Sequence, residues 1–302
     1  MSPLRAYLRL FRISVAFTPA GDVILGAALA HRWSGAAEGF SALGLAAACA
    51  VSTLIFSAAV AFNDLLDRHK DAVEAPRRPI PSGQIAPRAG FFAAVAAAVV
   101  ALAVAALLGR DLLIMVLIVL ALALLYDLVS RRSSLLGVLN LGLVRAADLG
   151  VGWMLVAEPG SLMELTQGIR WLAPAVYGVY ALALSGVALS ERRAKPSPAP
   201  IFFWVITGCT AVLFFAALGW GGAETGWRWL IPPLGMLLLA PLVRYLLFRQ
   251  RTRIEPIVGH MVSGYLLMAA LPVGALLSPT AGLILAGLFV LSRVLSRLFP
   301  PA

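Results

Sequence analysis

Three oxygen-bearing side chains are spaced four residues apart at the end of an apolar segment. Asn63, Asp67 and Asp71 stand at positions i, i+4 and i+8, and at 3.6 residues per turn they fall within about 80° of one another on one helical face. Asp64 lies about 100° away from them. Neighbouring carboxylates repel one another unless a cation accompanies them. Hard divalent cations prefer oxygen ligands, so the spacing predicts a Mg²⁺ site completed by substrate phosphate oxygens.

Two arginines and a proline-rich loop follow this group directly. Arg77 and Arg78 precede Pro79-Ile-Pro81-Ser-Gly83, whose prolines and glycine disfavour a helix. A guanidinium presents a fork of N–H donors that matches phosphate oxygens. A solvated loop at the membrane edge would explain the basic residues but not the aligned acids beside them. The combination indicates Mg²⁺-assisted binding of a phosphorylated substrate.

Most of the remaining chain is apolar. Of the 302 residues, 61% are hydrophobic and 13% are charged, against about 25% charged in soluble proteins. Segments of roughly 16–22 residues without a charge can cross a ~30 Å hydrocarbon core as helices. We expect nine such spans, near residues 14–30, 41–62, 90–109, 112–126, 135–157, 171–189, 200–219, 229–247 and 257–277. An apolar tail at 279–300 either lies at the interface or forms a partial tenth span.

These segments predict an all-α integral membrane protein with a single polytopic domain over residues 1–302. With an internal N-terminus, 17 Lys and Arg residues fall in internal segments and four in external loops, which is the positive-inside pattern. This pattern predicts an inner or plasma membrane protein whose N-terminus and polar loops 63–89, 127–134 and 190–200 face the cytoplasm. The three loops would form the mouth of the site. The net charge of +10 is then a consequence of topology and does not indicate a nucleic-acid partner.

The stretch from Asn63 to Asp71, followed by Arg78-Pro-Ile-Pro-Ser-Gly83, resembles the first signature of the UbiA superfamily of intramembrane prenyltransferases. The resemblance implies a ring of nine helices around a central cavity, and Mg²⁺-dependent transfer of an isoprenoid from its diphosphate to an acceptor. It assigns catalysis and Mg²⁺ binding to Asn63, Asp67 and Asp71. Arg77 and Arg78 become candidates for diphosphate contacts, and Asp64 is a further candidate for substrate binding.

The second signature of this superfamily, a pair of Asp residues four apart at the end of the sixth span, is incomplete in this chain. Val187 stands at the first position and Glu191 at the second. A valine cannot bind a metal ion. Glu191 is either a substrate-binding residue or a surface charge at the end of a helix. The second Mg²⁺ site of the superfamily is therefore impaired or is completed by other groups.

Polar residues inside the apolar segments are further candidates for substrate binding. An ionisable side chain within a membrane is costly and is usually turned inward and paired. Arg145 could pair with Asp148, three residues on, or face a cavity, and Asn140 lies nearer the internal end of the same segment. Asp22 has no obvious local partner, which favours a place in a cavity. The positions of Asp22, Asn140 and Arg145 resemble the EboC-like branch of the superfamily.

The internal loop after the fourth span contributes one more candidate. Tyr126 and Asp127 precede Arg131 there, and this resembles a tyrosine-containing loop of the superfamily. Arg131 either contacts the diphosphate or only anchors the internal face of the membrane protein.

From these residues and from the resemblance, we expect the chain to transfer a prenyl group from a polyprenyl diphosphate to a lipid-soluble or interfacial acceptor within the bilayer. Aromatic rings, quinone precursors and alcohols remain open as acceptors, as does the donor's chain length. The alternative is a protein on the same scaffold that binds or transports an isoprenoid or another amphiphile without transferring it. The incomplete second signature keeps this alternative open.

Overall fold

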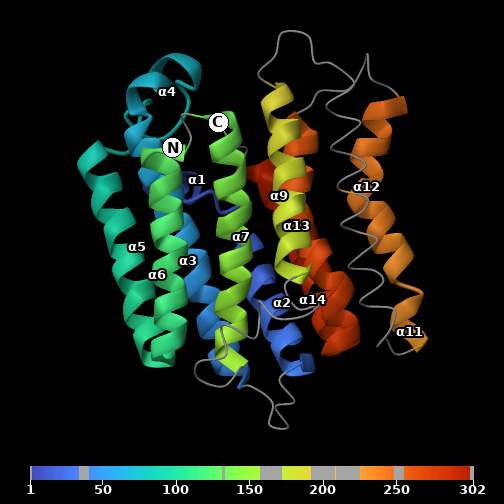
Figure 1. The fold of residues 1–302 in the computed structure, drawn as a ribbon. Coiled ribbons are helices and arrows are strands. Elements are labelled where there is room, and N and C mark those ends of the chain that lie inside the picture. The colour runs from blue at the N-terminus through green and yellow to red at the C-terminus, as the bar shows by residue number, and fades with distance from the viewer. Residues whose placement is uncertain are drawn as a thin grey trace.

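The computed structural model describes residues 2–33, 41–130, 133–156, 172–191, 208, 225–247 and 255–299. Every regular element in these ranges is a helix (Figure 1). The long helices are α2 (Thr18–Trp33), α3 (Ala42–Leu66), α5 (Pro87–Leu108), α6 (Arg110–Leu128), α7 (Ser134–Val156), α9 (Leu172–Glu191), α12 (Ile231–Leu247), α13 (Glu255–Leu276) and α14 (Pro279–Leu298). Three short helices, α1 (Pro3–Leu10), α4 (Arg68–Glu74) and α11 (Thr225–Arg228), accompany them. The prediction of an all-α protein is confirmed.

Six of the described helices are long and apolar enough to cross a membrane: α3, α5, α6, α7 from Leu135, α13 from Ile257, and α14. Helix α13 is largely buried within the bundle, whereas most residues of α5 and α14 are not buried, as expected where lipid is the surrounding solvent. The protein is therefore a multi-pass membrane protein. Of the two possibilities for the apolar tail, the structure supports a spanning helix, because α14 packs along α13.

Two of the nine expected spans need comment. The first, expected at 14–30, begins as a regular helix only at Thr18, after a series of turns. The span expected at 200–219 lies outside the described residues except for Gly208. The other expected spans each coincide with a described helix.

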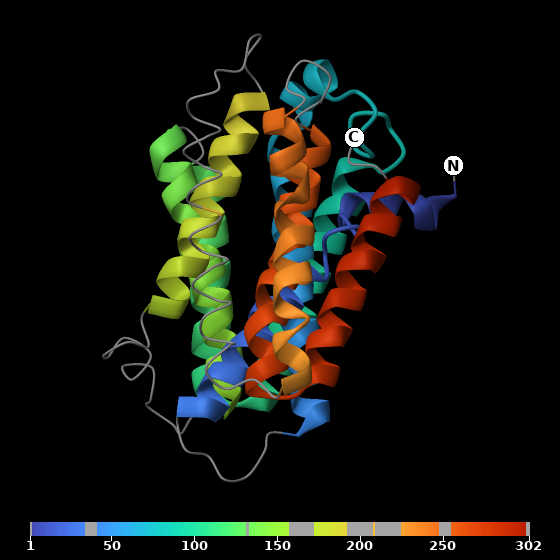
Figure 2. The ribbon, with the colours of Figure 1, turned by 90° about the vertical axis from the view of Figure 1, so that its right-hand side faces the viewer.

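The long helices run roughly along one axis (Figures 1 and 2), and from α2 to α9 each long helix points opposite to the one before it. Helix α4 and both chain termini lie at the same end of the bundle, which we call the α4 end. Helix α1 lies across the bundle near this end, beside the last turns of α14 (Figure 2). Arg5 of α1 donates a hydrogen bond to the carbonyl of Leu298 at 3.1 Å, which ties the two terminal helices together.

Helices α2 and α7 approach each other at backbone distance because each has a glycine at the crossing. A Cβ atom on Gly26 would collide with the backbone of Leu149, and one on Gly152 would collide with the backbone of Val23. Small residues allow this close packing of helices in membranes, where dispersion contacts replace the hydrophobic effect. The crossing brings Asp22 on α2 next to Arg145 on α7.

The segment predicted as the polar loop 63–89 is more ordered than a simple loop. It comprises the end of α3, the whole of α4 and a turn-rich connection over residues 75–86. Ile80 and Ile85 of this connection are buried, in a cluster that includes Leu10 and Leu65. The backbone N–H and the hydroxyl of Ser82 both donate to the carbonyl of Arg78, at 3.0 and 2.6 Å. These contacts fix the backbone that carries the Arg78 side chain.

Candidate active site

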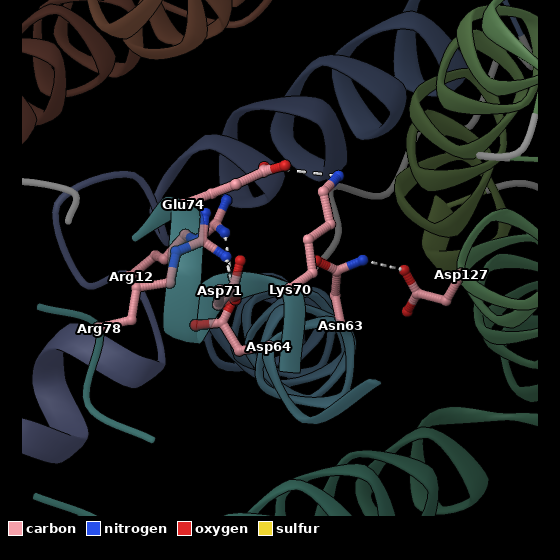
Figure 3. A network of polar contacts seen from close by, with 8 residues as sticks. All are labelled: Arg12, Asn63, Asp64, Lys70, Asp71, Glu74, Arg78 and Asp127. Carbon is pink, nitrogen blue, oxygen red and sulfur yellow. Dashed lines mark hydrogen bonds and ion pairs between the residues drawn. The ribbon is translucent and has the colours of Figure 1, made fainter. Parts of the chain in front are cut away.

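The predicted group of oxygen ligands lies where α3 passes into α4. Helix α3 ends at Leu66, Asp67 follows with φ −86° and ψ 3°, and α4 begins at Arg68. The backbone N–H groups of Asp67 and Asp71 still donate to the carbonyls of Asn63 and Asp67, at 2.9 and 2.8 Å. The backbone thus keeps helix-like bonds across the junction. The side chains of Asn63 and Asp71, however, point in different directions and bind different partners (Figure 3).

Asp71 and Asp64 share one arginine. Arg78 Nη1 lies 2.6 Å from Asp71 Oδ2 and 3.2 Å from Asp64 Oδ1. Arg12 Nη2 also donates to Asp64 Oδ1 at 3.3 Å (Figure 3). Asp64 and Asp71 are 3% and 5% exposed, and buried carboxylates need such charged hydrogen bonds to offset desolvation. The position of Asp64, which the helical spacing leaves open, is therefore beside Asp71.

Asn63 forms a second polar contact, with helix α6. Its side-chain Nδ2 donates to Asp127 Oδ1 at 2.7 Å (Figure 3). Asp127 is buried in the last turn of α6. Because the amide nitrogen is bonded to Asp127, the amide oxygen is the atom of Asn63 that would bind a cation. The contact also brings the carboxylate of Asp127, on helix α6, into the site, although the spacing of the residues on α3 and α4 does not predict it.

The residues at this junction fit the Mg²⁺ ion that the resemblance implies. The amide oxygen of Asn63 and the carboxylates of Asp67, Asp71 and Asp127 are the hard oxygen donors that Mg²⁺ prefers. Within the described ranges, no three His, Cys, Asp or Glu side chains gather closely enough to hold an ion by themselves. Mg²⁺ is commonly bound by one or two carboxylates plus substrate phosphates, so a closed cage of protein ligands is not required.

Arg77, Arg131 and Glu191 are the other residues predicted to contact the diphosphate. Arg77 is exposed, and its backbone carbonyl accepts a hydrogen bond from Arg9 Nη2 at 3.2 Å. Arg131 lies outside the described residues. Glu191 is the last residue of α9, but the position of its side chain lies outside the description. The structure thus leaves the predicted roles of Arg131 and Glu191 as predictions.

Asn140 links the start of α7 to the segment after α6. Its Nδ2 donates to Ser130 Oγ at 3.3 Å. Its Oδ1 is buried and accepts no hydrogen bond from the part of the chain that the structure describes. Asn140 therefore lies towards the α4 end of the bundle with one unused acceptor.

A buried polar cluster lies deeper in the bundle. Arg145 Nη2 donates to Asp22 Oδ1 at 2.9 Å, and the hydroxyl of Tyr177 donates to the same oxygen. The guanidinium of Arg145 also sits 3.8 Å from the ring centroid of Tyr265, a favourable cation–π geometry. Asp22 is fully buried. The partner of Arg145 is thus Asp22, whereas the local alternative, Asp148, accepts a hydrogen bond from Ser52.

The depth of this cluster follows from helix geometry. Ser52 lies 11 residues before Asn63 on α3, which corresponds to roughly 16 Å along the helix axis. That is about half the ~30 Å thickness of a hydrocarbon core. The cluster therefore lies about half a membrane thickness along the bundle from Asn63, well away from the Mg²⁺ candidate residues.

Several participants in these contacts were not proposed as site residues from sequence, among them Arg12, Asp127 and Tyr177. Arg12 is only one of many basic residues of the internal face when read in sequence. Its backbone φ of 47° is rare for a residue other than glycine and typically costs about 1–2 kcal/mol. Of these three, only Asp127 could have been recognised from sequence, because it is a single acid at the carboxyl-terminal end of an apolar helix.

The fold and the site together define a class of protein. It is a multi-pass helical membrane protein with acids, an amide and arginines gathered at one end of the bundle. The chain belongs to the UbiA prenyltransferase family, whose sequence profile matches residues 22–261. The carboxyl-terminal part of α13 and all of α14 lie beyond the matched region.

Curated relatives match over shorter stretches. The bacteriochlorophyll synthase 33 kDa chain of Cereibacter sphaeroides is 36% identical over 105 residues, which cover 35% of this chain and 34% of that protein. The digeranylgeranylglyceryl phosphate synthase of Methanothrix thermoacetophila is 40% identical over 72 residues, which cover 22% of this chain and 27% of that protein. The chain thus spans about a third or less of the length of these relatives.

Solved structures match over nearly the whole chain. A UbiA homologue from Aeropyrum pernix superposes with a TM-score of 0.67 at 18% identity, over 90% of this chain and 98% of that chain. A UbiA homologue from Archaeoglobus fulgidus, solved bound to GPP and Mg²⁺, superposes with a TM-score of 0.60 at 15% identity, over 93% and 99% of the two chains. At these identities the similarity establishes the fold.

Proposed function

We propose that this protein is a Mg²⁺-dependent prenyltransferase that moves an isoprenoid chain from its diphosphate to a lipid-soluble or interfacial acceptor. The observation that carries the proposal is the constellation at the α3–α4 junction. Arg78 orients Asp71 and Asp64, and Asn63 lies against Asp127 on the neighbouring helix α6. Oxygen ligands beside arginines are the combination needed to bind a diphosphate through a metal ion.

The comparisons support the donor side of this proposal. The chain belongs to a prenyltransferase family, and a homologue with the same fold was solved with GPP and Mg²⁺ bound. The two named relatives are a bacteriochlorophyll synthase chain and a digeranylgeranylglyceryl phosphate synthase. Their names denote different products, so both the acceptor and the donor's chain length stay open for this chain.

In the proposed reaction, the side chains at the α4 end bind and orient the donor diphosphate. Asn63, Asp67 and Asp71 would hold Mg²⁺, with Asp127 as an additional oxygen donor. Bound Mg²⁺ supplies charge neutralisation for the leaving diphosphate. Arg77 and Arg78 would donate hydrogen bonds to diphosphate oxygens, while Arg78 also keeps Asp71 and Asp64 in place. Arg131, in the segment after α6, and Glu191, at the end of α9, are proposed to approach the same group.

Deeper side chains would line the path of the isoprenoid and the acceptor. Asn140 lies on α7 nearer the α4 end, and its unused acceptor suits a hydrogen-bond donor on a substrate. Arg145 and Asp22 lie deeper in the bundle, where their pairing lets ionised groups remain in an apolar surrounding. A central cavity of the kind that the resemblance implies, enclosed by lipid-embedded helices, would keep water away from the allylic cation formed when the diphosphate leaves.

The proposed topology places the α4 end in the cytoplasm of an inner or plasma membrane protein. Cytoplasmic segments of membrane proteins carry an excess of Lys and Arg. The described basic residues of α1, of the α3–α5 connection and of the last turns of α12 and α14 support this orientation. A diphosphate donor made in the cytoplasm would then reach the site directly.

A second candidate function is suggested by the valine at position 187. Without a carboxylate there, the second metal site of the superfamily lacks one of its two acids. A protein that binds an isoprenoid diphosphate through the first site, and does not transfer it, would need no second site. This candidate shares the donor-binding residues with the transferase and differs from it in turnover.

One assay separates the two functions. The purified full chain, reconstituted in lipid, is incubated with a radiolabelled prenyl diphosphate and a broad mixture of acceptors, with and without Mg²⁺. Asp67→Ala is compared with the wild type, and Asp111→Ala, at the start of α6, serves as the control. Mg²⁺-dependent consumption that is lost only in Asp67→Ala supports a transferase. Binding without consumption favours the second candidate, and no binding contradicts both.

A further inference from the structure

A groove of about 770 Å³ lies on the outer surface of the bundle, where the end of α3 meets the start of α5. Its apolar walls include Phe62, Leu66, Phe91 and Phe92, and two arginines, Arg68 and Arg88, also line it. Phe91 and Phe92 are 45% and 67% exposed. The groove is therefore open to the surroundings of the bundle and is not part of its interior.

The depth of the groove in the membrane follows from its position on α5. This helix begins at Pro87, so Arg88 lies in its first turn. Phe91 and Phe92 lie about one turn further in, roughly 5 Å closer to the middle of the membrane. The two guanidiniums therefore lie at headgroup level, where arginine side chains of membrane proteins reach the interface. The phenyl rings lie where acyl chains begin.

The side chains of the groove match an amphiphile with a negative headgroup. Phe91 and Phe92 pack against each other edge-on, with ring centroids 5.8 Å apart, and form an apolar wall below the arginines. Arg68 Nη1 donates to the carbonyl of Leu65 at 3.3 Å, which holds its guanidinium beside the end of α3. Basic pockets between transmembrane helices on the cytoplasmic side of a membrane attract anionic lipids.

We propose that this groove binds an anionic glycerophospholipid. Arg68 and Arg88 would bind the phosphate of its headgroup, and one acyl chain would lie along Phe62, Leu66 and the two phenylalanines of α5. A zwitterionic phospholipid would fit the apolar wall equally well but would carry no net negative charge toward the two guanidiniums. The site thus selects by charge, and its selectivity weakens as ionic strength rises.

The groove adjoins the candidate active site through the chain itself. Arg68 is the first residue of α4 and directly follows Asp67. A lipid phosphate bound at Arg68 therefore restrains the α3–α4 junction from the membrane side, while Arg78 restrains it through Asp71 from the other. An anionic lipid is in this way a structural ligand of the junction, whichever reaction the protein performs.

Native mass spectrometry of the purified full chain in detergent tests the proposal. Phosphatidylglycerol and phosphatidylcholine with identical acyl chains are titrated separately, and dissociation constants are compared for the wild type, Arg88→Gln and Arg68→Gln/Arg88→Gln. An arginine near a membrane surface contributes roughly 1 kcal/mol to binding an anionic lipid. We therefore expect phosphatidylglycerol affinity to fall about fivefold in the single variant and about 25-fold in the double variant. Affinity for phosphatidylcholine, whose choline offsets the charge of its phosphate, should fall by clearly less in both variants.

Two further arms make the result decisive. Arg244→Gln removes an exposed arginine from the last turn of α12, outside the groove, and should leave phosphatidylglycerol affinity unchanged. Farnesyl diphosphate without Mg²⁺ tests whether the arginines instead capture the isoprenoid donor. Equal affinities for the two phospholipids would overturn the proposal, as would an equal loss in Arg244→Gln. A double variant that loses farnesyl diphosphate but keeps phosphatidylglycerol would also overturn it.

Discussion

Arg78 Nη1 lies 2.6 Å from Asp71 Oδ2, and the same nitrogen lies 3.2 Å from Asp64 Oδ1. One cation from the connection after α4 therefore binds one carboxylate of α3 and one of α4. Asp64 and Asp71 are almost fully buried, while the Arg78 side chain is 23% exposed. The carboxylates are thus held in place before any ligand arrives, and the arginine retains a solvent-facing side.

Arg78→Lys tests this arrangement, because lysine keeps the charge but has a single ammonium in place of the guanidinium fork. We expect the free energy of unfolding to fall by about 1–3 kcal/mol, less than the roughly 3–5 kcal/mol for breaking a fully buried pair. Thermal unfolding in detergent measures the change. Arg77→Lys is the matched control, since Arg77 is the exposed neighbour. Equal losses in the two variants would show that Arg78 has no special role.

Asn63→Asp places a second carboxylate 2.7 Å from the position of Asp127 Oδ1. Like charges at this distance disfavour the folded state unless a cation lies between them. Without divalent ions, the variant should unfold at a lower temperature than the wild type. Added Mg²⁺ should then raise its unfolding temperature by more than it raises that of the wild type. An equal Mg²⁺ effect in both proteins would argue against a cation beside Asn63.

Gly152→Ala should disrupt the crossing of α2 and α7, because the added Cβ meets the backbone of Val23. Overpacking of this kind costs about 1–3 kcal/mol. Gly287→Ala is the control, since a Cβ there meets no atom within 4 Å, and alanine is the better helix former by roughly 0.5–1 kcal/mol. The unfolding temperature of Gly152→Ala should lie below that of the wild type, and that of Gly287→Ala should lie above it. Similar unfolding temperatures would contradict the close crossing.

The Asp22–Arg145 pair predicts strong non-additivity. Removing one partner leaves a buried charge uncompensated, which typically costs about 3–5 kcal/mol. Asp22→Leu and Arg145→Met should each destabilise the protein by about that amount, and the double variant should lose clearly less than the sum of the two. A double-mutant cycle of unfolding free energies measures the coupling. Additive losses would mean that the two side chains do not pair.

The helices were largely predictable from sequence because charge-free segments of the right length must be helical in lipid. The tail at 279–300 was ambiguous by composition, since α14 ends with Arg293 and Arg297. The structure supports a spanning helix, because α14 is long and apolar enough to cross a membrane and packs along α13. Pairing between distant helices was not predictable. Asp22 and Arg145 are 123 residues apart, and neither position specifies the other in a single sequence.

The site was predictable in part for a similar reason. Helical spacing places Asn63, Asp67 and Asp71 near one another, but it does not say what each side chain binds. Asn63 turns to Asp127, 64 residues on, and Asp71 turns to Arg78, in a loop whose path depends on the burial of Ile80 and Ile85. The metal-binding roles of Asn63, Asp67 and Asp71 stay predictions that the geometry supports.

The most direct test of a Mg²⁺–diphosphate site at the α3–α4 junction is equilibrium binding of geranyl thiodiphosphate, a donor analogue that is cleaved slowly. Binding to the purified protein is measured with and without Mg²⁺ for the wild type, Asp71→Ala and Asp111→Ala, the last removing an acid from the start of α6. We predict tight binding only with Mg²⁺, its loss in Asp71→Ala and its retention in Asp111→Ala. Binding that does not depend on Mg²⁺, or that persists in Asp71→Ala, would contradict a Mg²⁺–diphosphate site at this junction.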